Sequence, residues 1–281
     1  MKDMNWITKF TLVACAILAI AGTKALAHIS YTGRNFGTLI ISADVSNTTQ
    51  VVSSGFGWAD ATDADWGDSH RGRFFRFNLT NTLAGDQGVR ITVSRNLLGT
   101  GGTNGTFLPA FSLFSGLAHL SSPLAHDRSA LSVQWLRQQF GTNSTGLGGS
   151  GKEGSLNALG DWAIGNSVSE YVIDPSDSLE FFTYIAHAAD GTSANFGNVA
   201  GIVGDGTADG FVTATFTGLA AGDYSLFVGG ANYDLQTTEI GPTTYPTYGI
   251  NVTVGLVPEP STSSLVLGSA ALLGLLRRRK A

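Results

Sequence analysis

Residues 211–228 read FVTATFTGLAAGDYSLFV and carry the clearest structural pattern in the chain. Phe211, Thr213 and Thr215 alternate with Val212, Ala214 and Phe216. Successive side chains of a strand point to opposite faces, so this alternation predicts a β-strand. Residues 218–223 then supply Gly and Asp for a turn, and residues 224–228 are expected to form a return strand. The segment therefore predicts a hairpin.

Residues 74–93 repeat this organisation, with a strand at 74–79, a turn containing Gly and Asp, and a strand at 89–93. Phe75, Phe77 and Leu79 would share one face of the first strand. Further strands are expected at residues 38–45, 107–114, 179–186 and 248–254. Short strands at this spacing, with 37 glycines and only 13% charged residues, are typical of an all-β sandwich.

The two repeated segments resemble bacterial pre-peptidase C-terminal-like β-sandwich modules, in which a Gly-Asp-Tyr turn precedes a strand. Gly222-Asp223-Tyr224 is the matching triplet, and the resemblance covers about half of the region between the two ends of the chain. It implies a small, jelly-roll-like domain of the accessory or binding kind, without catalytic residues of its own.

The middle of the chain breaks this rhythm of strands and turns. Residues 128–140 have apolar residues at positions compatible with one short helix, and residues 156–162 are compatible with a helical turn. Between them, residues 141–154 are rich in Gly, Ser and Thr, which is typical of a loop. We therefore expect a partly helical insertion at about residues 118–178 of a β-sandwich domain that spans residues 28–257.

The N-terminal residues 1–27 have the features of a secretory signal peptide. Lys2 and Lys9 give a positive start, residues 10–21 are apolar, and Ala25-Leu26-Ala27 fits the pattern that signal peptidase cleaves. A transmembrane anchor is the alternative, but the apolar run is shorter than the ~20 residues that a span requires. Cleavage after Ala27 would make His28 the first residue of the mature protein.

The C-terminal residues 258–281 combine a proline-containing turn, an apolar stretch at 265–276 and a basic end. A short apolar helix followed by Arg277-Arg278-Arg279-Lys280 can cross a bilayer with its positive end in the cytoplasm. A buried amphipathic helix is the alternative, but the stretch has no polar face. We therefore expect a C-terminal transmembrane helix that anchors the domain transiently in the inner membrane.

This tail resembles the PEP-CTERM sorting signal, with Pro258-Glu259-Pro260, the apolar stretch and Arg277, Arg278 and Arg279 in the same order. The resemblance implies recognition by an exosortase, a membrane protease-transpeptidase of Gram-negative bacteria. It also implies delivery to the cell surface or extracellular matrix and an association with exopolysaccharide and biofilm material.

The exported region is strongly acidic. Removing the two ends takes away seven basic and two acidic residues, which leaves nine basic and nineteen acidic residues and a net charge of −10. Such a charge disfavours nucleic acid and anionic lipid as partners. The single cysteine, Cys15, lies in the signal peptide, so the mature protein has no disulfide and no thiolate.

Two binding sites are weighed in this region. The stretch 60–68 offers Asp60, Asp63, Asp65 and Asp68 as oxygen ligands for calcium, although no Glu closes the loop as in the EF-hand. The alternative is a solvated loop whose Asp residues cap turns. A glycan could stack on exposed aromatic rings, for which the candidates are Tyr31, Trp58, Trp66, Trp135, Trp162, Tyr233, Tyr245 and Tyr248.

A third candidate is copper at the mature N-terminus. His28 would carry both a free α-amino group and an imidazole, and a second histidine would complete a three-nitrogen site. This arrangement resembles the copper brace of lytic polysaccharide monooxygenases. The second histidine would be one of four candidates: His70, His119, His126 or His187.

No motif in the sequence indicates catalysis, since both the Gly-x-Ser-x-Gly and the His-Glu-x-x-His patterns are missing. The sequence therefore predicts a secreted, exosortase-sorted surface or matrix protein that is structural and not an enzyme. A glycan-binding module supported by calcium is the first alternative, and a copper-dependent enzyme is the second.

Overall fold

The computed structural model describes residues 29–41, 43–59, 66–83, 87–101, 106–118, 154–165, 178–239 and 245–257. Across these ranges the chain is mostly β, as the sequence predicts, with one short helix. The elements in chain order are β1 (Asn35–Thr38), β2 (Val45–Ser53), β3 (Trp66–Asp68), β4 (Arg73–Leu79), β5 (Gly88–Gly99), β6 (Pro109–Ser115), β7 (Ser155–Asn157), β8 (Trp162–Gly165), β9 (Leu179–Ala189), β10 (Phe211–Thr217), β11 (Gly222–Gly230), α3 (Tyr233–Glu239) and β12 (Thr247–Val257).

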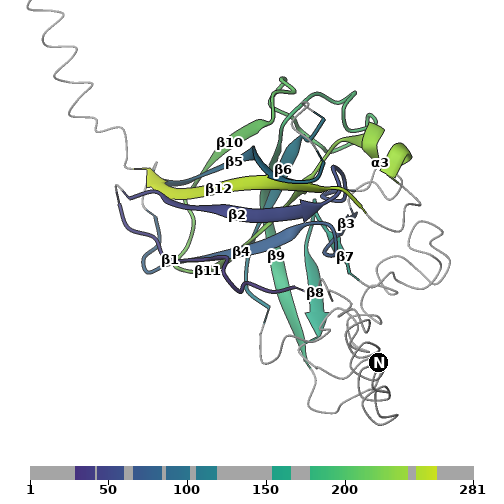
Figure 1. Cartoon of the computed structure of the whole chain (residues 1–281). Helices are drawn as coiled ribbons and strands as arrows, with labels where there is room; N and C mark the ends of the chain where they lie inside the picture. The colour runs from purple at the N-terminus through teal and green to yellow at the C-terminus, as the bar shows by residue number, and fades with distance from the viewer. Residues whose placement is uncertain are drawn as a thin grey trace, which may run out of the picture.

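The described strands form two main sheets that pack face to face. One sheet has six strands in the order β1-β4-β11-β6-β9-β8, and the other has four in the order β10-β5-β12-β2. Figure 1 shows β2 and β12 side by side in one layer, with β4 and β11 in the other. Phe75, Phe77 and Leu226 of the first sheet meet Ile91 and Val252 of the second in one apolar cluster. The arrangement is therefore sandwich-like.

The six-stranded sheet is also buried on its outer face. Phe74, Phe114 and Phe182 point away from the inter-sheet core and pack in a second cluster with Trp58 and Leu156. Phe74 and Phe75 are adjacent in β4 and are both almost fully buried. Apolar side chains on both faces of a strand require cover on both faces, and here the outer cover comes from distant parts of the chain.

The predicted hairpins are wrong, because each repeated segment crosses from one sheet to the other. In the first, β4 belongs to the six-stranded sheet and β5 to the four-stranded sheet. In the second, β10 pairs with β5, whereas β11 pairs with β4 and β6. Both connections are therefore arches over the end of the sandwich.

The two arches lie side by side. The backbone N–H of Leu83 donates to the carbonyl of Leu219 at 2.8 Å, and the N–H of Ala221 donates to the Thr82 hydroxyl at 3.1 Å. Gly218, which has φ of +68°, starts the second arch in a conformation that favours glycine. The internal likeness of the sequence therefore produces two matched crossings.

Two further local predictions are corrected. The expected single strand at 38–45 does not form. Instead, β1 ends at Thr38 in the six-stranded sheet, and β2 begins at Val45 in the four-stranded sheet. The expected helical turn at 156–162 is also wrong, because β7 ends at Asn157 and β8 begins at Trp162. Trp162 of β8 stacks on Phe182 with ring centroids 4.2 Å apart, so packing on β9 sets its conformation.

The remaining predicted segments lie outside the described residues. These are the signal peptide, the candidate helix at 128–140, the loop at 141–153 and the apolar stretch at 265–276. Where the structure is described, no helix is both long enough and apolar enough to span a bilayer.

Candidate functional site

The outer face of the six-stranded sheet holds a polar network around His187. In β9 and β6, His187 lies opposite Ser112, and Tyr184 lies opposite Phe114. A register irregularity between Leu113 and Phe114 gives β9 one additional residue there. Tyr184 and His187 are three apart and would normally face opposite ways, and this bulge brings them to the same face.

Both ring nitrogens of His187 are engaged in hydrogen bonds. Nε2 accepts the backbone N–H of Val203 at 2.9 Å, so the ring proton lies on Nδ1, which faces the Tyr184 hydroxyl oxygen at 2.6 Å. Burial lowers the pKa of His187 and raises that of Tyr184 to about 12. The imidazole is therefore neutral, and a metal at Nε2 would have to displace the N–H of Val203.

Trp58 covers this network from a loop. Its indole lies 5.5 Å from the His187 ring, and its Nε1–H donates to the Ser112 hydroxyl at 2.8 Å. Ser112 in turn donates to the carbonyl of Ala158 at 2.5 Å. Trp58 and Ser112 are both fully buried, so the chain from the indole to the Ala158 carbonyl satisfies each polar group in turn.

Of the calcium candidates, only Asp68 falls within the described residues, while Asp60, Asp63 and Asp65 lie outside them. The Asp68 carboxylate is buried in β3, where it meets Arg71 Nε at 3.3 Å and His70 Nδ1 at 3.1 Å. It also accepts the backbone N–H of His70 at 2.9 Å. These contacts occupy Asp68 with local partners, and calcium binding by this stretch stays a prediction.

A second acidic loop joins β9 to β10. Asp190 is buried and accepts the backbone N–H groups of Asp209 at 3.0 Å and Gly210 at 2.6 Å. Burial raises the pKa of Asp190 to about 6, aided by the charges of Asp205 and Asp209 and opposed by the two N–H donors. The loop at 205–210 is thus a turn that leads into β10.

The histidines considered for copper are not brought together by the described residues. His28, His119 and His126 lie outside these residues, and His70 and His187 each have partners of their own. Among the residues that the structure describes, no three His, Cys, Asp or Glu side chains are grouped to hold a metal ion. Copper at His28 therefore stays a prediction.

Most of the candidate sugar-stacking rings are inside the protein. Five candidate rings are buried and cannot form an exposed stacking surface: Tyr31, Trp58, Trp66, Trp162 and Tyr248. The ring of Tyr245 is covered by the guanidinium of Arg71, 4.2 Å from its centroid. Tyr233 is 36% exposed, and Trp135 lies outside the described residues. Trp58 is buried because it lies over the outer sheet face, which sequence periodicity does not reveal.

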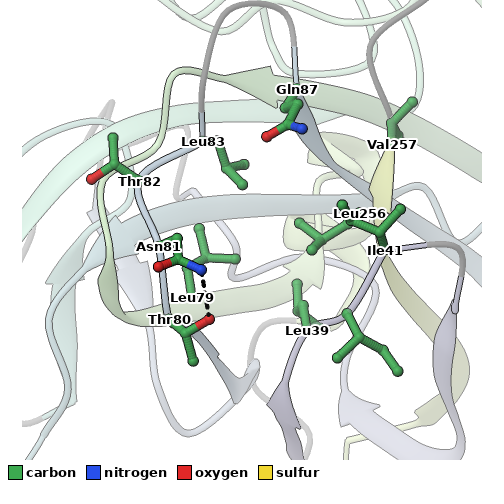
Figure 2. A pocket seen from close by; sticks show the side chains of 11 residues that line it. Leu39, Ile41, Leu79, Thr80, Asn81, Thr82, Leu83, Gln87, Leu256 and Val257 are labelled. Atoms are coloured by element: carbon green, nitrogen blue, oxygen red, sulfur yellow. Dashed lines mark hydrogen bonds between the residues drawn. The ribbon is translucent and has the colours of Figure 1, made fainter.

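The end of the sandwich that carries the arches contains an apolar groove of about 310 Å³. Figure 2 shows its lining, to which the end of β4 contributes Leu79, the first arch contributes Leu83, and the end of β12 contributes Leu256 and Val257. Ile41 completes one wall and is held by a β-bridge to Leu256. The only sequence signal for this groove is the unbroken apolar run Leu39-Ile40-Ile41, which periodicity alone does not distinguish from a strand.

Residues 256–280 match the PEP-CTERM protein-sorting motif. The match begins in the last two residues of β12 and continues beyond the described residues. The chain is therefore an exosortase-sorted surface protein, in agreement with the sequence analysis. No curated protein matches the chain in sequence.

Two solved structures align with most of the chain at low similarity. One is CorA of Methylomicrobium album BG8, described as a surface-associated copper-binding protein, with 15% identity, a TM-score of 0.45, and 82% of this chain and 98% of CorA covered. The other is the secreted protein MopE of Methylococcus capsulatus, in which an oxidized tryptophan facilitates copper binding. Its identity is 14% and its TM-score 0.39, with 79% of this chain and 86% of MopE covered. At these TM-scores neither structure assigns a ligand to this chain.

Proposed function

We propose that this protein is a structural, non-enzymatic component of the exopolysaccharide material at or beyond the cell surface. The observation that carries this proposal is the position of the sorting motif, which starts where the last strand of the sandwich ends. An exosortase can then cut or transfer the chain there without touching the packed sheets.

The interior of the body supports a structural role. Two of the fully buried polar residues, Ser112 and Asp190, have backbone or side-chain partners within the protein. Catalytic groups are commonly left poised for a substrate, whereas these groups are used up in holding strands and loops. The net charge of −10 keeps the exported region soluble and away from nucleic acid.

The test is the terminal composition of the native protein extracted from the cell surface, with and without the exosortase. Mass spectrometry should find an N-terminal peptide that begins at His28 and no peptide beyond about Ser261, because both signals are removed during export. In cells without the exosortase, the tail should stay on the protein. Recovery of residues 277–281 from the mature surface pool of normal cells would overturn the proposal.

A further inference from the structure

The groove at the arch end is bordered by two of the most exposed large apolar side chains that the structure describes. Ile40 is 63% exposed and Ile41 is 56% exposed, and both line the groove. Among the described residues that line the groove none is charged, and the polar ones are Thr and amide side chains of the first arch. An apolar, uncharged surface of this kind marks a site of contact with another apolar phase or partner.

The groove lies at the first residues of the sorting motif. Ile41 is bridged to Leu256, and Leu256 and Val257 are both groove residues and the first residues of the sorting motif. Seven residues separate Val257 from Leu265, where the apolar stretch begins. Fully extended, they would reach at most about 28 Å. While the tail spans the bilayer, the groove is thus confined to the neighbourhood of the membrane surface.

We propose that the groove and the exposed isoleucines form a face that lies on the lipid bilayer while the chain is anchored. The inference rests on the proposed sorting function, because the tail must first insert. The bilayer is the occupant best matched to this face, since the tether brings the face to it and an apolar face gains by entering the interface.

Two charges beside the groove compensate each other. Asp44 and Arg90, next to β12, form an ion pair at 2.9 Å, so this pair does not oppose contact of the neighbouring apolar side chains with a bilayer. Seating this face would hold Pro258-Glu259-Pro260 at the membrane surface, where a membrane-embedded processing enzyme can reach it. Removal of the tail then takes away the tether, and the sandwich can leave the bilayer.

The experiment compares two single-cysteine variants of the chain spanning residues 28–281, which has no cysteine of its own. Ile41→Cys labels the proposed face, and Leu97→Cys is the matched control. Leu97 is 83% exposed and lies near the end of β5 that pairs with the start of β12, at the opposite end of the sandwich. Each variant carries an environment-sensitive fluorophore and is reconstituted into phosphatidylcholine vesicles, with and without lipids that quench fluorescence at shallow depth.

The label at Ile41 should shift to shorter wavelength and lose at least about half of its intensity to the quenching lipids, while the label at Leu97 should keep almost all of it. Equal quenching at the two positions, or none at Ile41, would overturn the proposal. The label at Ile41 could also shift to shorter wavelength in vesicles without being quenched by the lipids, and keep that shift in detergent. This result would show that the tail or a second copy covers the face, which also overturns the proposal. The outcome is independent of tail removal, so the proposed function can fail or succeed separately.

Discussion

His187 is the clearest case of a single side chain whose state follows from its surroundings. A half-buried imidazole that accepts one N–H and faces one hydroxyl is stable when neutral. Protonation would place a second N–H against the N–H of Val203. The neighbouring buried donors are also satisfied, since the indole N–H of Trp58 donates to Ser112 and the Ser112 hydroxyl donates to the carbonyl of Ala158. The network is therefore sensitive to the loss of any one member.

The titration of His187 should contribute to the pH dependence of the free energy of unfolding. Burial lowers its pKa from the ordinary 6.5, so the unfolded state binds the proton more readily than the folded state. The contribution to the free energy of unfolding is complete above about 6.5 and is lost as the pH falls below it. Urea titrations should show that stability declines less steeply from pH 7 to 5 in His187→Gln than in the wild type. Parallel curves for the two proteins would contradict this account.

The titration of Asp190 should lower the free energy of unfolding as the pH rises, which is the opposite of the effect of His187. Its pKa is raised from 3.8 to about 6, so the folded state holds the proton more tightly than the unfolded state. The associated stability is present below about 3.8 and is lost as the pH rises through about 6. In urea titrations from pH 4 to 7, the stability of the wild type relative to Asp190→Asn should therefore fall with rising pH. A relative stability that stays constant over this range would be inconsistent with a buried titrating carboxyl.

Ser112→Ala tests the hydrogen-bond chain. The substitution leaves the buried indole N–H of Trp58 and the carbonyl of Ala158 without their partner, which should cost about 1–3 kcal/mol of unfolding free energy. Ser46→Ala is the matched control, because its hydroxyl bonds to Thr253 in an exposed position and its loss should cost within about 0.5 kcal/mol. Chemical denaturation measures both, and similar values for the two variants would argue against the network.

At the level of strands, the two sheets differ in how they are buried. The six-stranded sheet has apolar clusters on both faces, whereas β10, at the edge of the four-stranded sheet, keeps one face toward water. The central strand β11 is accordingly buried without a break from Tyr224 to Gly230, whereas burial alternates along β10. Position in the fold, more than intrinsic preference, sets these patterns.

Alanine substitutions should follow this difference. Phe74→Ala and Phe75→Ala remove neighbouring side chains from opposite faces of β4, and each should cost about 3–5 kcal/mol. Thr215→Ala on the exposed face of β10 should change stability by no more than about 0.5 kcal/mol. If Phe74→Ala proved as mild as Thr215→Ala in denaturant titrations, the outer face of the sheet would not be buried in solution.

For the molecule as a whole, the sorting tail and the sandwich meet at one point, the end of β12. Because β12 pairs with both β5 and β2, it holds the four-stranded sheet together up to Val257. The motif needs only Leu256 and Val257 from this strand. Sorting and folding therefore use almost separate parts of the chain.

Truncated chains should show that the fold does not require the sorting tail. A chain that ends at Val257 should melt within a few degrees of the chain that ends at Ala281, because all the described core residues remain. A chain that ends at Asn251 loses Val252 and Val254 from the core, and it should not fold cooperatively. Calorimetry or thermal circular dichroism distinguishes these outcomes, and a large loss of stability in the first truncation would show that the tail supports the fold.

Local patterns were enough to predict the class of fold and the sorting motif. Alternation in residues such as 74–79 and 211–217 reports burial on at least one face, because side-chain direction depends only on the local backbone. The signals at the two ends are likewise read from short, contiguous stretches, and the sorting motif is confirmed.

Strand pairing and the interior polar network depend on contacts between distant segments. The four residues between β10 and β11 can close a hairpin or cross to the opposite sheet, and only packing against β4, β5 and β6 selects the crossing. His187, Ser112 and Trp58 are far apart in sequence and meet because β6 and β9 pair and a loop folds over them. The groove beside Val257 arises in the same way, from the first arch, Ile41 and the end of β12. Such sites follow from long-range sheet pairing and burial, which local periodicity does not encode.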